Sequence, residues 1–361
     1  MLDEWALHTP KGPLTNYYMS ENRSEISQLG EFGLIDRIRE KFTLVNSTSL
    51  TGIGDDAAVI EAGGDNILVS TDMLVEGIHF DLSYTPIHHL GYKAVAVNVS
   101  DIAAMNGRAE QVTVSIALSN RFSVEAVDAL YAGIKAACEN YKVDLVGGDT
   151  TSSASGLVIS ITVLGRAKKE KIVYRSGAKA NDIICVTGDL GAAFTGLQVL
   201  AREKEVFLSD PGMQPDLEKY EYLVGRQLKP EARTDIVFDL ADAGVVPTSM
   251  IDVSDGLASD LLHIAKNSGV GLRIYEDKVP IDHATFETAI EFKLDPITCA
   301  LNGGEDYELL FTIDKADQEK IKNHPDIHFI GYIHERKNEN VLITKQESAV
   351  PLRAQGWDHF K

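Results

Sequence analysis

The chain has 361 residues, 44% of them hydrophobic and 24% charged, which is enough to bury a globular core and favours two domains. The formal net charge of −20 argues against nucleic acid as a partner, because nucleic-acid-binding surfaces are basic. Phosphate substrates stay open, since bound metal ions reverse the local sign of charge. The three cysteines are scattered and form no CxxC pair, so neither a zinc site nor a disulfide framework is indicated.

The N-terminus has no basic-then-apolar signal pattern, and no stretch reaches about 18 consecutive apolar residues. We therefore expect a cytoplasmic, soluble protein without a membrane partner. Residues 1–27 are polar and aperiodic, which predicts a loosely ordered N-terminal extension.

The first half of the chain predicts mixed helices and strands. Local signals conflict over 90–105, where 94–99 alternates like a strand, but the length and the final Asn-Gly favour a helix. The other expected elements are helices over 32–42 and 123–141 and strands over 66–72, 111–118, 143–146 and 157–165.

A charged connection at 166–171 marks the expected domain boundary, so that two α/β or α+β domains, 28–166 and 167–361, follow the extension 1–27. Residues 203–226 are charged and interrupted by proline, which predicts a surface excursion. The elements expected in this half are strands over 182–187, 271–275 and 307–313 and helices through 200, from about 233 and over 259–267.

Carboxylates recur where apolar runs end. Asp252 and Asp255 stand in Met-Ile-Asp-Val-Ser-Asp-Gly-Leu, which reads as a buried strand end leading into a helix; an ordinary helix N-cap is the alternative. The same pattern recurs at Asp55-Asp56, Asp72, Asp101, Asp149 and Glu305-Asp306. Six such places predict a shared carboxylate-lined pocket for hard cations, because Mg²⁺ prefers oxygen ligands and substrate phosphates.

Other motifs are absent or ambiguous. The sequence contains neither a Walker A motif nor the protein-kinase motifs. Residues 52–57 match a dinucleotide fingerprint only formally, since two carboxylates would face the pyrophosphate. Residues 188–191 fit either a tight turn or a phosphate site at a helix N-terminus. His79 is either structural or part of the site, and Trp357 either closes a core or stacks on a ring.

Together the motifs resemble the thiamine-monophosphate kinase family, of the superfamily that includes aminoimidazole ribonucleotide synthetase and selenophosphate synthetase. The resemblance spans roughly 29–360, while the N-terminal extension and the 203–226 insert depart from the family pattern. The motifs are Gly-Glu-Phe-Gly-Leu-Ile (30–35), Gly-Ile-Gly-Asp-Asp (52–56), Ser-Thr-Asp-Met-Leu-Val-Glu-Gly-Ile-His-Phe (70–80), Val-Asn-Val-Ser-Asp-Ile-Ala-Ala-Met (97–105), Gly-Gly-Asp (147–149), Arg-Ser-Gly-Ala (175–178), Leu-Lys-Pro (228–230), Asp-Val-Ser-Asp-Gly (252–256), Gly-Gly-Glu-Asp-Tyr (303–307) and Gly-Trp-Asp-His-Phe (356–360).

The resemblance implies a two-domain fold of the aminoimidazole ribonucleotide synthetase type, whose N-terminal domain binds ATP and metal and dimerises through its sheet. It implies several Mg²⁺ ions with ligands at Asp56, Ser70, Thr71, Asp72, Asp101, Asp149, Asp252 and Asp255. It also implies ATP contacts at Tyr131, Gly148, Asp149, Arg175 and Ser254, and thiamine-phosphate contacts at His79, Glu305 and Trp357. Asp56, Asp101, Asp149 and Asp252 would be the catalytic residues.

The implied reaction is direct phosphoryl transfer from ATP to thiamine phosphate, which needs positioning and charge neutralisation. Two alternatives stay open: another ATP-dependent enzyme of the superfamily, such as a cyclo-ligase or a selenophosphate synthetase, and a non-catalytic nucleotide or metal sensor. A selenophosphate synthetase typically needs a reactive N-terminal cysteine, whereas the first cysteine here is Cys138. The complete carboxylate set argues against a sensor.

Overall fold

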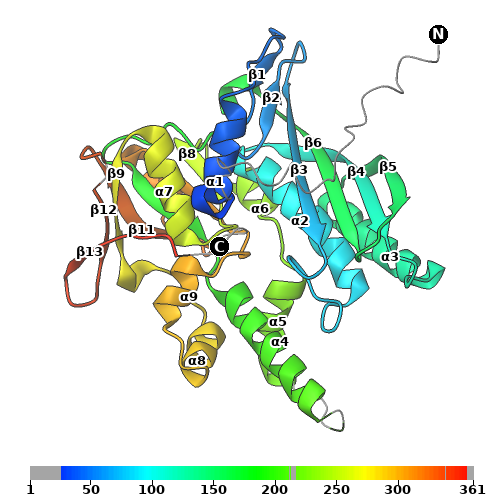
Figure 1. Ribbon diagram of the computed structural model, residues 1–361. Coiled ribbons are helices and arrows are strands. Elements are labelled where there is room, and N and C mark those ends of the chain that lie inside the picture. Colours follow the sequence, from blue (N-terminus) through cyan, green and yellow to red (C-terminus); the bar gives the residue numbers. More distant parts are fainter. Residues whose placement is uncertain (1–25, 211, 213–216, 338, 356–361) are drawn as a thin grey trace, which may run out of the picture. The chain divides into compact units, whose positions relative to one another are not determined.

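The computed structural model describes residues 26–210, 212, 217–337 and 339–355, so residues 1–25 and Trp357 lie outside the described part (Figure 1). The described residues fall into two compact units, one with residues 26–43 and the other with the described residues from 44 to 355. The described part of the first unit contains α1 (Ile26–Arg39), which begins before the helix predicted over 32–42 and bends at Gly30, where φ is 65°.

The second unit contains two sheets, and the first has six strands (Figure 1). Strand β5 is parallel to β4 at one edge, and the other neighbours are antiparallel. The strands predicted over 66–72, 111–118, 143–146 and 157–165 are confirmed as β3, β4, β5 and β6, whereas β1 and β2 were not predicted. The order is β1 (Ser49–Thr51), β2 (Ala58–Ile60), β3 (Asn66–Val75), β6 (Val158–Ala167), β4 (Arg108–Leu118) and β5 (Asp144–Ser152).

Two helices pack against this sheet. The ambiguous segment 90–105 is helical, as α2 (Ile87–Ala104), and α3 (Val124–Tyr141) begins after Ser123, whose side chain accepts a hydrogen bond from the Ala126 amide. The two helices approach closely at two glycines. A Cβ on Gly91 would lie 2.1 Å from the Leu130 carbonyl oxygen, so a larger residue there would push the helices apart.

The second sheet has seven strands, and its middle is built from segments far apart in the chain. Strand β10 lies between β7 and β8 and is antiparallel to both. The strands predicted over 182–187, 271–275 and 307–313 are confirmed as β7, β9 and β10, whereas β11, β12 and β13 were not predicted. The order is β13 (Ala349–Pro351), β12 (Asn340–Ile343), β9 (Gly271–Tyr275), β11 (Ile327–His334), β7 (Ile183–Thr187), β10 (Leu309–Ile313) and β8 (Ser249–Asp252).

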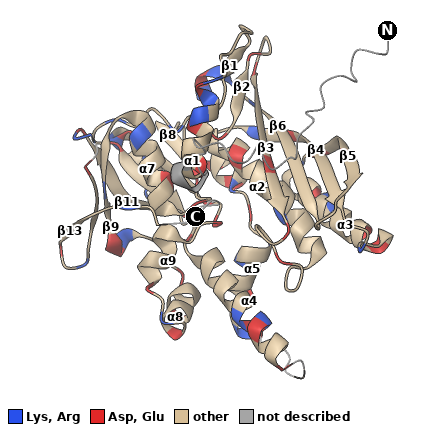
Figure 2. Ribbon diagram, viewed as in Figure 1, with Lys and Arg blue, Asp and Glu red and all other residues tan. Residues whose placement is uncertain are grey.

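The segment 203–226, predicted as a surface excursion, is exposed or half-buried at nearly all its described residues, but most of it is helical. The helix α4 (Ala192–Ser209) continues through the charged run, with acidic and basic residues interspersed along it (Figure 2). After the undescribed residues, Tyr220 and Leu223 are buried and pack against α4, and α5 (Glu221–Leu228) follows. The remaining helices are α6 (Thr234–Asp242) and α7 (Leu257–Ser268), both predicted, and α8 (His283–Glu291), α9 (Pro296–Asn302) and α10 (Gln318–Ile321).

Helix α2 contributes to the cores of both sheets. Leu90, Val95 and Val99 are buried with the six-stranded sheet, whereas Ala103 and Ala104 pack with Cys185, Met250 and Phe311 of the seven-stranded sheet. Such a helix is apolar nearly all round, which explains the conflicting pattern in the sequence. The mixed α/β fold with two sheets is therefore confirmed. Within the described ranges, no helix is both long enough and apolar enough to cross a bilayer.

Candidate functional site

The site is built where β8 ends and α7 begins. Asp252 is the last residue of β8 and is buried, and the Ser100 hydroxyl of α2 donates a 2.6 Å hydrogen bond to its Oδ2. The N-cap of α7 is Gly256, with φ of 107°, and no side chain caps the helix there. The predicted strand end leading into a helix is confirmed, and the alternative of a simple aspartate cap is wrong.

Three of the predicted carboxylates converge here. Asp56 comes from the loop between β1 and β2, Asp101 from α2 and Asp252 from β8, and one carboxylate oxygen of each lies within 4.8 Å of the others. The Ser70 hydroxyl of β3 donates a 2.6 Å hydrogen bond to Asp101 Oδ2, which fixes that side chain. Residues from four separated segments therefore form one oxygen-rich cluster.

The charge of this cluster is poorly compensated by the chain itself. Burial, with Asp56 and Asp72 nearby, raises the pKa of Asp252 to about 7, and burial with the Asp72 and Asp252 charges raises the pKa of Asp101 well above its usual range. The Arg175 guanidinium donates to Asp56 Oδ1 at 2.6 Å. Oδ2 of Asp56 is buried and has no hydrogen-bond partner among the described residues.

These observations fit a divalent cation. Buried carboxylates that repel one another resist ionisation unless a counter-charge is present. One arginine for three carboxylates leaves that requirement unmet, and an unpartnered carboxylate oxygen is a vacant ligand position. An all-oxygen donor set is the chemistry that Mg²⁺ takes in proteins.

Neighbouring residues of β3 face opposite sides of the sheet. Ser70 and Asp72 pair with the buried Val163 and Ile161 of β6, and the Asp72 amide donates to Asn98 Oδ1 of α2, so this side faces the cluster. Thr71 is exposed on the other side and donates to the Ile161 carbonyl oxygen at 3.0 Å. The structure therefore does not bring the Thr71 side chain to the cluster.

Gly148 and Asp149 lie on the exposed edge strand β5. Across the sheet, Asp72, Ile161, Val114 and Gly148 lie in one row, so three strand spacings, roughly 14 Å, separate Asp72 from Gly148. Within one chain, Asp149 is thus not part of the cluster, and Tyr131 is partly buried against the core of the first sheet.

Glu305 is held by two side chains that were not predicted. Lys93 Nζ of α2 lies 2.8 Å from Oε1, and Gln227 Nε2 of α5 lies 2.7 Å from Oε2. Burial would raise the pKa of Glu305, but the Lys93 charge, both hydrogen bonds and nearby His79 lower it overall. The His79 ring accepts a 3.0 Å hydrogen bond from the Val75 amide through Nδ1. The predicted pair His79 and Glu305 is therefore linked by charge, and each member is fixed by its own hydrogen bonds.

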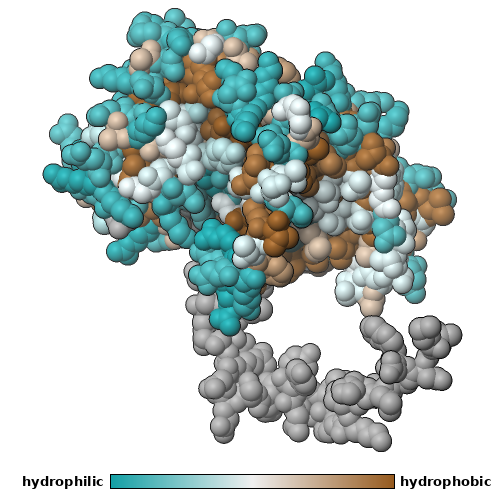
Figure 3. Space-filling model, turned by 90° about the horizontal axis from the view of Figure 1, so that it is seen from above, coloured by the Kyte–Doolittle hydropathy of each residue, from teal (hydrophilic) through white to brown (hydrophobic). Residues whose placement is uncertain are grey.

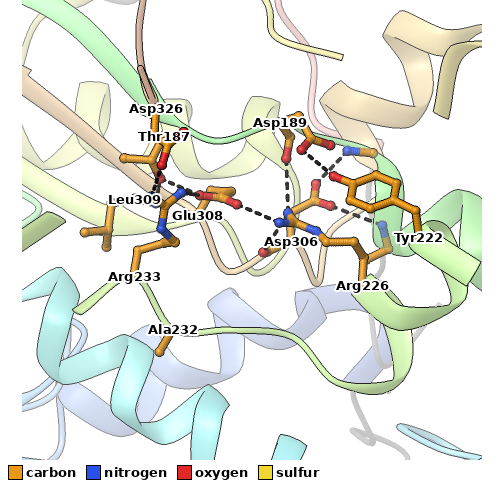
Figure 4. A network of polar contacts seen from close by, with 12 residues as sticks. Thr187, Asp189, Tyr222, Arg226, Ala232, Arg233, Asp306, Glu308, Leu309 and Asp326 are labelled. Carbon is orange, nitrogen blue, oxygen red and sulfur yellow. Dashed lines mark hydrogen bonds and ion pairs between the residues drawn. The ribbon is translucent and has the colours of Figure 1, made fainter. Parts of the chain in front are cut away.

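Two neighbours of Glu305 have structural partners. The Asp306 carboxylate accepts hydrogen bonds from the Gly191 and Ala193 amides at 2.8 and 3.3 Å, so it occupies the N-terminus of α4 and the phosphate interpretation of 188–191 is wrong. Glu308 lies between two arginines: Arg226 Nη1 is 2.8 Å from Oε1, and Arg233 Nη1 is 2.7 Å from Oε2 (Figure 4).

The structure resembles known proteins along nearly its whole length. Family models of the AIR synthase related protein match residues 54–167 (N-terminal domain) and 179–343 (C-terminal domain). The thiamine-monophosphate kinase of Bacillus subtilis is 36% identical over 346 residues, covering 92% of this chain and all of that protein. The chain belongs to the thiamine-monophosphate kinase family. Its counterpart in Aquifex aeolicus is also 36% identical, over 93% of this chain and 99% of the relative.

Solved structures agree with this family membership. AaThiL complexed with AMPPCP and TMP has a TM-score of 0.81 at 33% identity and covers 94% of this chain and 100% of that one. Thiamine-monophosphate kinase from Stenotrophomonas maltophilia K279a has a TM-score of 0.69 at 33% identity, and the match covers 89% of this chain and 98% of that one. The predicted family and its two-domain fold are therefore confirmed.

Proposed function

We propose that the protein is an ATP-dependent kinase that phosphorylates thiamine phosphate, giving thiamine diphosphate and ADP in thiamine diphosphate biosynthesis. The observation that carries this proposal is the convergence of Asp56, Asp101 and Asp252, with a vacant carboxylate oxygen, in a chain that matches thiamine-monophosphate kinases over nearly its full length. Both the donor and the acceptor are anionic, so the site must bring like charges together.

We propose that Asp56, Asp101 and Asp252 hold Mg²⁺, with Ser70, Asp72 and Asp255 beside them. Bound Mg²⁺ supplies neutralisation of the phosphate charges during transfer. The Ser70 and Ser100 hydroxyls orient two of the carboxylates through 2.6 Å hydrogen bonds. Thr71 and Asp149, on the outer face and at the edge of the sheet, stay predicted ligands and would serve cations outside this cluster.

We further propose that Tyr131, Gly148, Asp149, Arg175 and Ser254 contact ATP and that His79, Glu305 and Trp357 contact thiamine phosphate. The charge interaction between His79 and the fixed carboxylate of Glu305 supports the second group. Transfer would be direct, because carboxylates that hold a cation are poor nucleophiles and the acceptor phosphate is already a competent one.

We propose a cytoplasmic homodimer formed through the N-terminal sheets, with the domains divided at 28–166 and 167–361. An exposed sheet edge such as β5 needs covering, and Leu145 and Val146 on it are 43% and 59% exposed. Apolar residues also reach the surface elsewhere (brown in Figure 3), so exposure alone does not identify the interface. Light scattering at micromolar concentration should give twice the chain mass; the mass of one chain would count against the dimer.

The deciding experiment is turnover with ATP, Mg²⁺ and thiamine phosphate, with both products quantified. Stoichiometric thiamine diphosphate and ADP are expected. ATP consumption without thiamine diphosphate would favour another activity of the superfamily, and binding without turnover would favour a sensor. Incubation with γ-labelled ATP and Mg²⁺ alone should leave no label on the denatured protein; label that later passes to thiamine phosphate would overturn direct transfer.

A further inference from the structure

We propose that Lys93 and Gln227 are positioning residues that act through Glu305 and thereby set the affinity for thiamine phosphate. The inference rests on the proposed function, in which Glu305 contacts that acceptor. The three residues come from α2, α5 and the segment before β10, and they form a closed set of contacts. Lys93 Nζ donates to Glu305 Oε1 at 2.8 Å and to the Gln227 carbonyl oxygen at 3.2 Å, and Gln227 Nε2 donates to Glu305 Oε2 at 2.7 Å.

The two partners fix the carboxylate and leave it usable. Lys93 and Gln227 are 3% and 6% exposed, so neither side chain can swing away without disturbing the core. Each oxygen of Glu305 accepts one of these hydrogen bonds, whereas a carboxylate offers about four acceptor positions. The side chain of Glu305 keeps 30% of its surface exposed. The free positions can therefore receive donors from a ligand, such as the amino group of the pyrimidine ring.

The backbone at Glu305 supports a role in positioning. Glu305 and Tyr307 have φ of 58° and 53°, a conformation that residues with side chains seldom adopt. Strain of this kind persists only where surrounding contacts impose it. Here the Glu305 and Tyr307 amides bond to the Ser254 and Val253 carbonyl oxygens, next to Asp252. The segment that carries Glu305 is thus held against the end of β8.

Lys93 also separates two kinds of carboxylate. Burial and then the charges of Glu305, Asp72 and Asp252 raise the pKa of the Tyr307 phenol, so Glu305 and two carboxylates of the metal-site region act on the same side chain. An ammonium group bound to Glu305 makes it a poor metal ligand, because the cation would have to displace a buried charge. Lys93 therefore reserves Glu305 for the organic acceptor.

Helix α2 sets the distance between the two ends of the site. Lys93 anchors Glu305, and Ser100, seven residues later and on the same side of the helix, anchors Asp252. Seven residues of α-helix span about 10 Å. An extended organic cation with a terminal phosphate can bridge such a distance, with its phosphate toward Asp252 and its pyrimidine toward Glu305.

The test compares Michaelis constants for the two substrates in single variants. Lys93→Met and Gln227→Met should each raise KM for thiamine phosphate about tenfold, because an oriented hydrogen bond to a charged group is lost, while KM for ATP changes less than about twofold. Lys93→Arg should recover part of the loss. Calorimetric titration with thiamine phosphate should show that the dissociation constant of each variant exceeds that of the parent protein by the same factor as KM does.

A matched control is Arg233→Met, which removes a largely buried cation from Glu308 in the same segment without touching Glu305. It should lower the melting temperature but leave the ratio of the two KM values unchanged. If Lys93→Met and Gln227→Met behave like this control, they are merely structural and the inference is wrong.

Combined variants separate the possible failures. Because Lys93 and Gln227 act through Glu305, adding either change to Glu305→Gln should cost no further affinity, whereas independent effects would add. If Glu305→Gln alone leaves KM for thiamine phosphate unchanged, the proposed acceptor contact fails. If Glu305→Gln raises that KM but Lys93→Met and Gln227→Met do not, only the positioning inference fails. If Lys93→Met does not fold, Gln227→Met still tests the inference, because it leaves the ion pair between Lys93 and Glu305 intact.

Discussion

Two buried carboxylates, Asp252 and Glu308, lie beside adjacent strands and differ in the charge of their neighbours. Asp252 ends β8, and Glu308 precedes β10, whose first residue, Leu309, pairs with Asp252. Glu308 receives Arg226, Arg233 and the Thr187 hydroxyl, the last at 2.6 Å (Figure 4). Asp252 receives the Ser100 hydroxyl and faces two more carboxylates.

The difference distinguishes Glu308, whose charge the chain itself balances, from Asp252, which we propose binds a cation. Where the chain supplies cations to a buried carboxylate, the charge is balanced in the folded protein itself. Where it supplies further carboxylates, the balance must come from a bound cation. Burial of an acidic residue alone therefore does not indicate a site; the identity of its neighbours does.

The largest effect should come from neutralising the uncompensated group. Asp252→Asn should lower turnover at least about 10²-fold, because one ligand that positions both phosphates is lost. Without Mg²⁺ the same variant should melt no lower than the parent protein, since a repulsive charge is removed. Asp101→Asn should behave alike. Steady-state kinetics with thermal unfolding checks both, and near-normal turnover would contradict the assignment.

The compensated group should respond in the opposite manner. Arg233→Met should lower the free energy of unfolding by about 2 kcal/mol, because Glu308 loses a charged hydrogen-bond partner and retains Arg226. Its affinity for Mg²⁺ should stay unchanged. Chemical denaturation and a Mg²⁺ titration measure the two quantities, and a parallel loss of both would show that the groups are not separate.

The pH dependence of stability should distinguish the groups without mutation. The pKa of Asp252 is raised from 3.8 to about 7 by burial and by neighbouring carboxylates. The protonated form is favoured in the folded state, so its stabilisation is complete below about pH 4 and is lost as the pH rises toward 7. Without metal, the protein should lose about 2–3 kcal/mol of stability between pH 5 and 7.5. Saturating Mg²⁺ should abolish or reverse that loss; equal slopes with EDTA and with Mg²⁺ would argue against a cation site.

The smallest effect belongs to an ion pair in solvent. Lys135 Nζ and Glu139 Oε1 on α3 lie 3.0 Å apart, and most of each side chain is exposed. Because such pairs contribute little, Lys135→Met should leave turnover and melting temperature within experimental error. A clear drop in turnover or in melting temperature would show that exposure does not predict how much an ion pair contributes to this protein.

Much of the cluster could be predicted because its signal is local. Apolar runs ending in Asp are readable from the sequence, and so is the Ser123 cap of α3. The opposite faces of Thr71 and Asp72 follow from strand alternation, but the pairing with β6 decides which of them faces α2.

The partners of Glu305 and Glu308 could not be predicted in the same way. Lys93 is the only lysine or arginine of α2, which is a signal, but nothing local indicates that Glu305, 212 positions later, is its partner. The charged composition of 203–226 predicted its exposure, but it carries no clear signal that most of the segment is helical or that Tyr220 and Leu223 are buried.

The central position of β10 has a consequence for the order of synthesis and folding. Its neighbour β7 ends at Thr187, 122 residues before Leu309. At roughly 5–20 residues per second, a ribosome needs about 6 to 24 seconds to supply the missing strand. During that interval β7 and β8 have no β10 to pair with, and α4 lacks the carboxylate of its Asp306 cap. We therefore expect the nascent C-terminal half to be the part of the chain most dependent on chaperones and the most sensitive to C-terminal truncation.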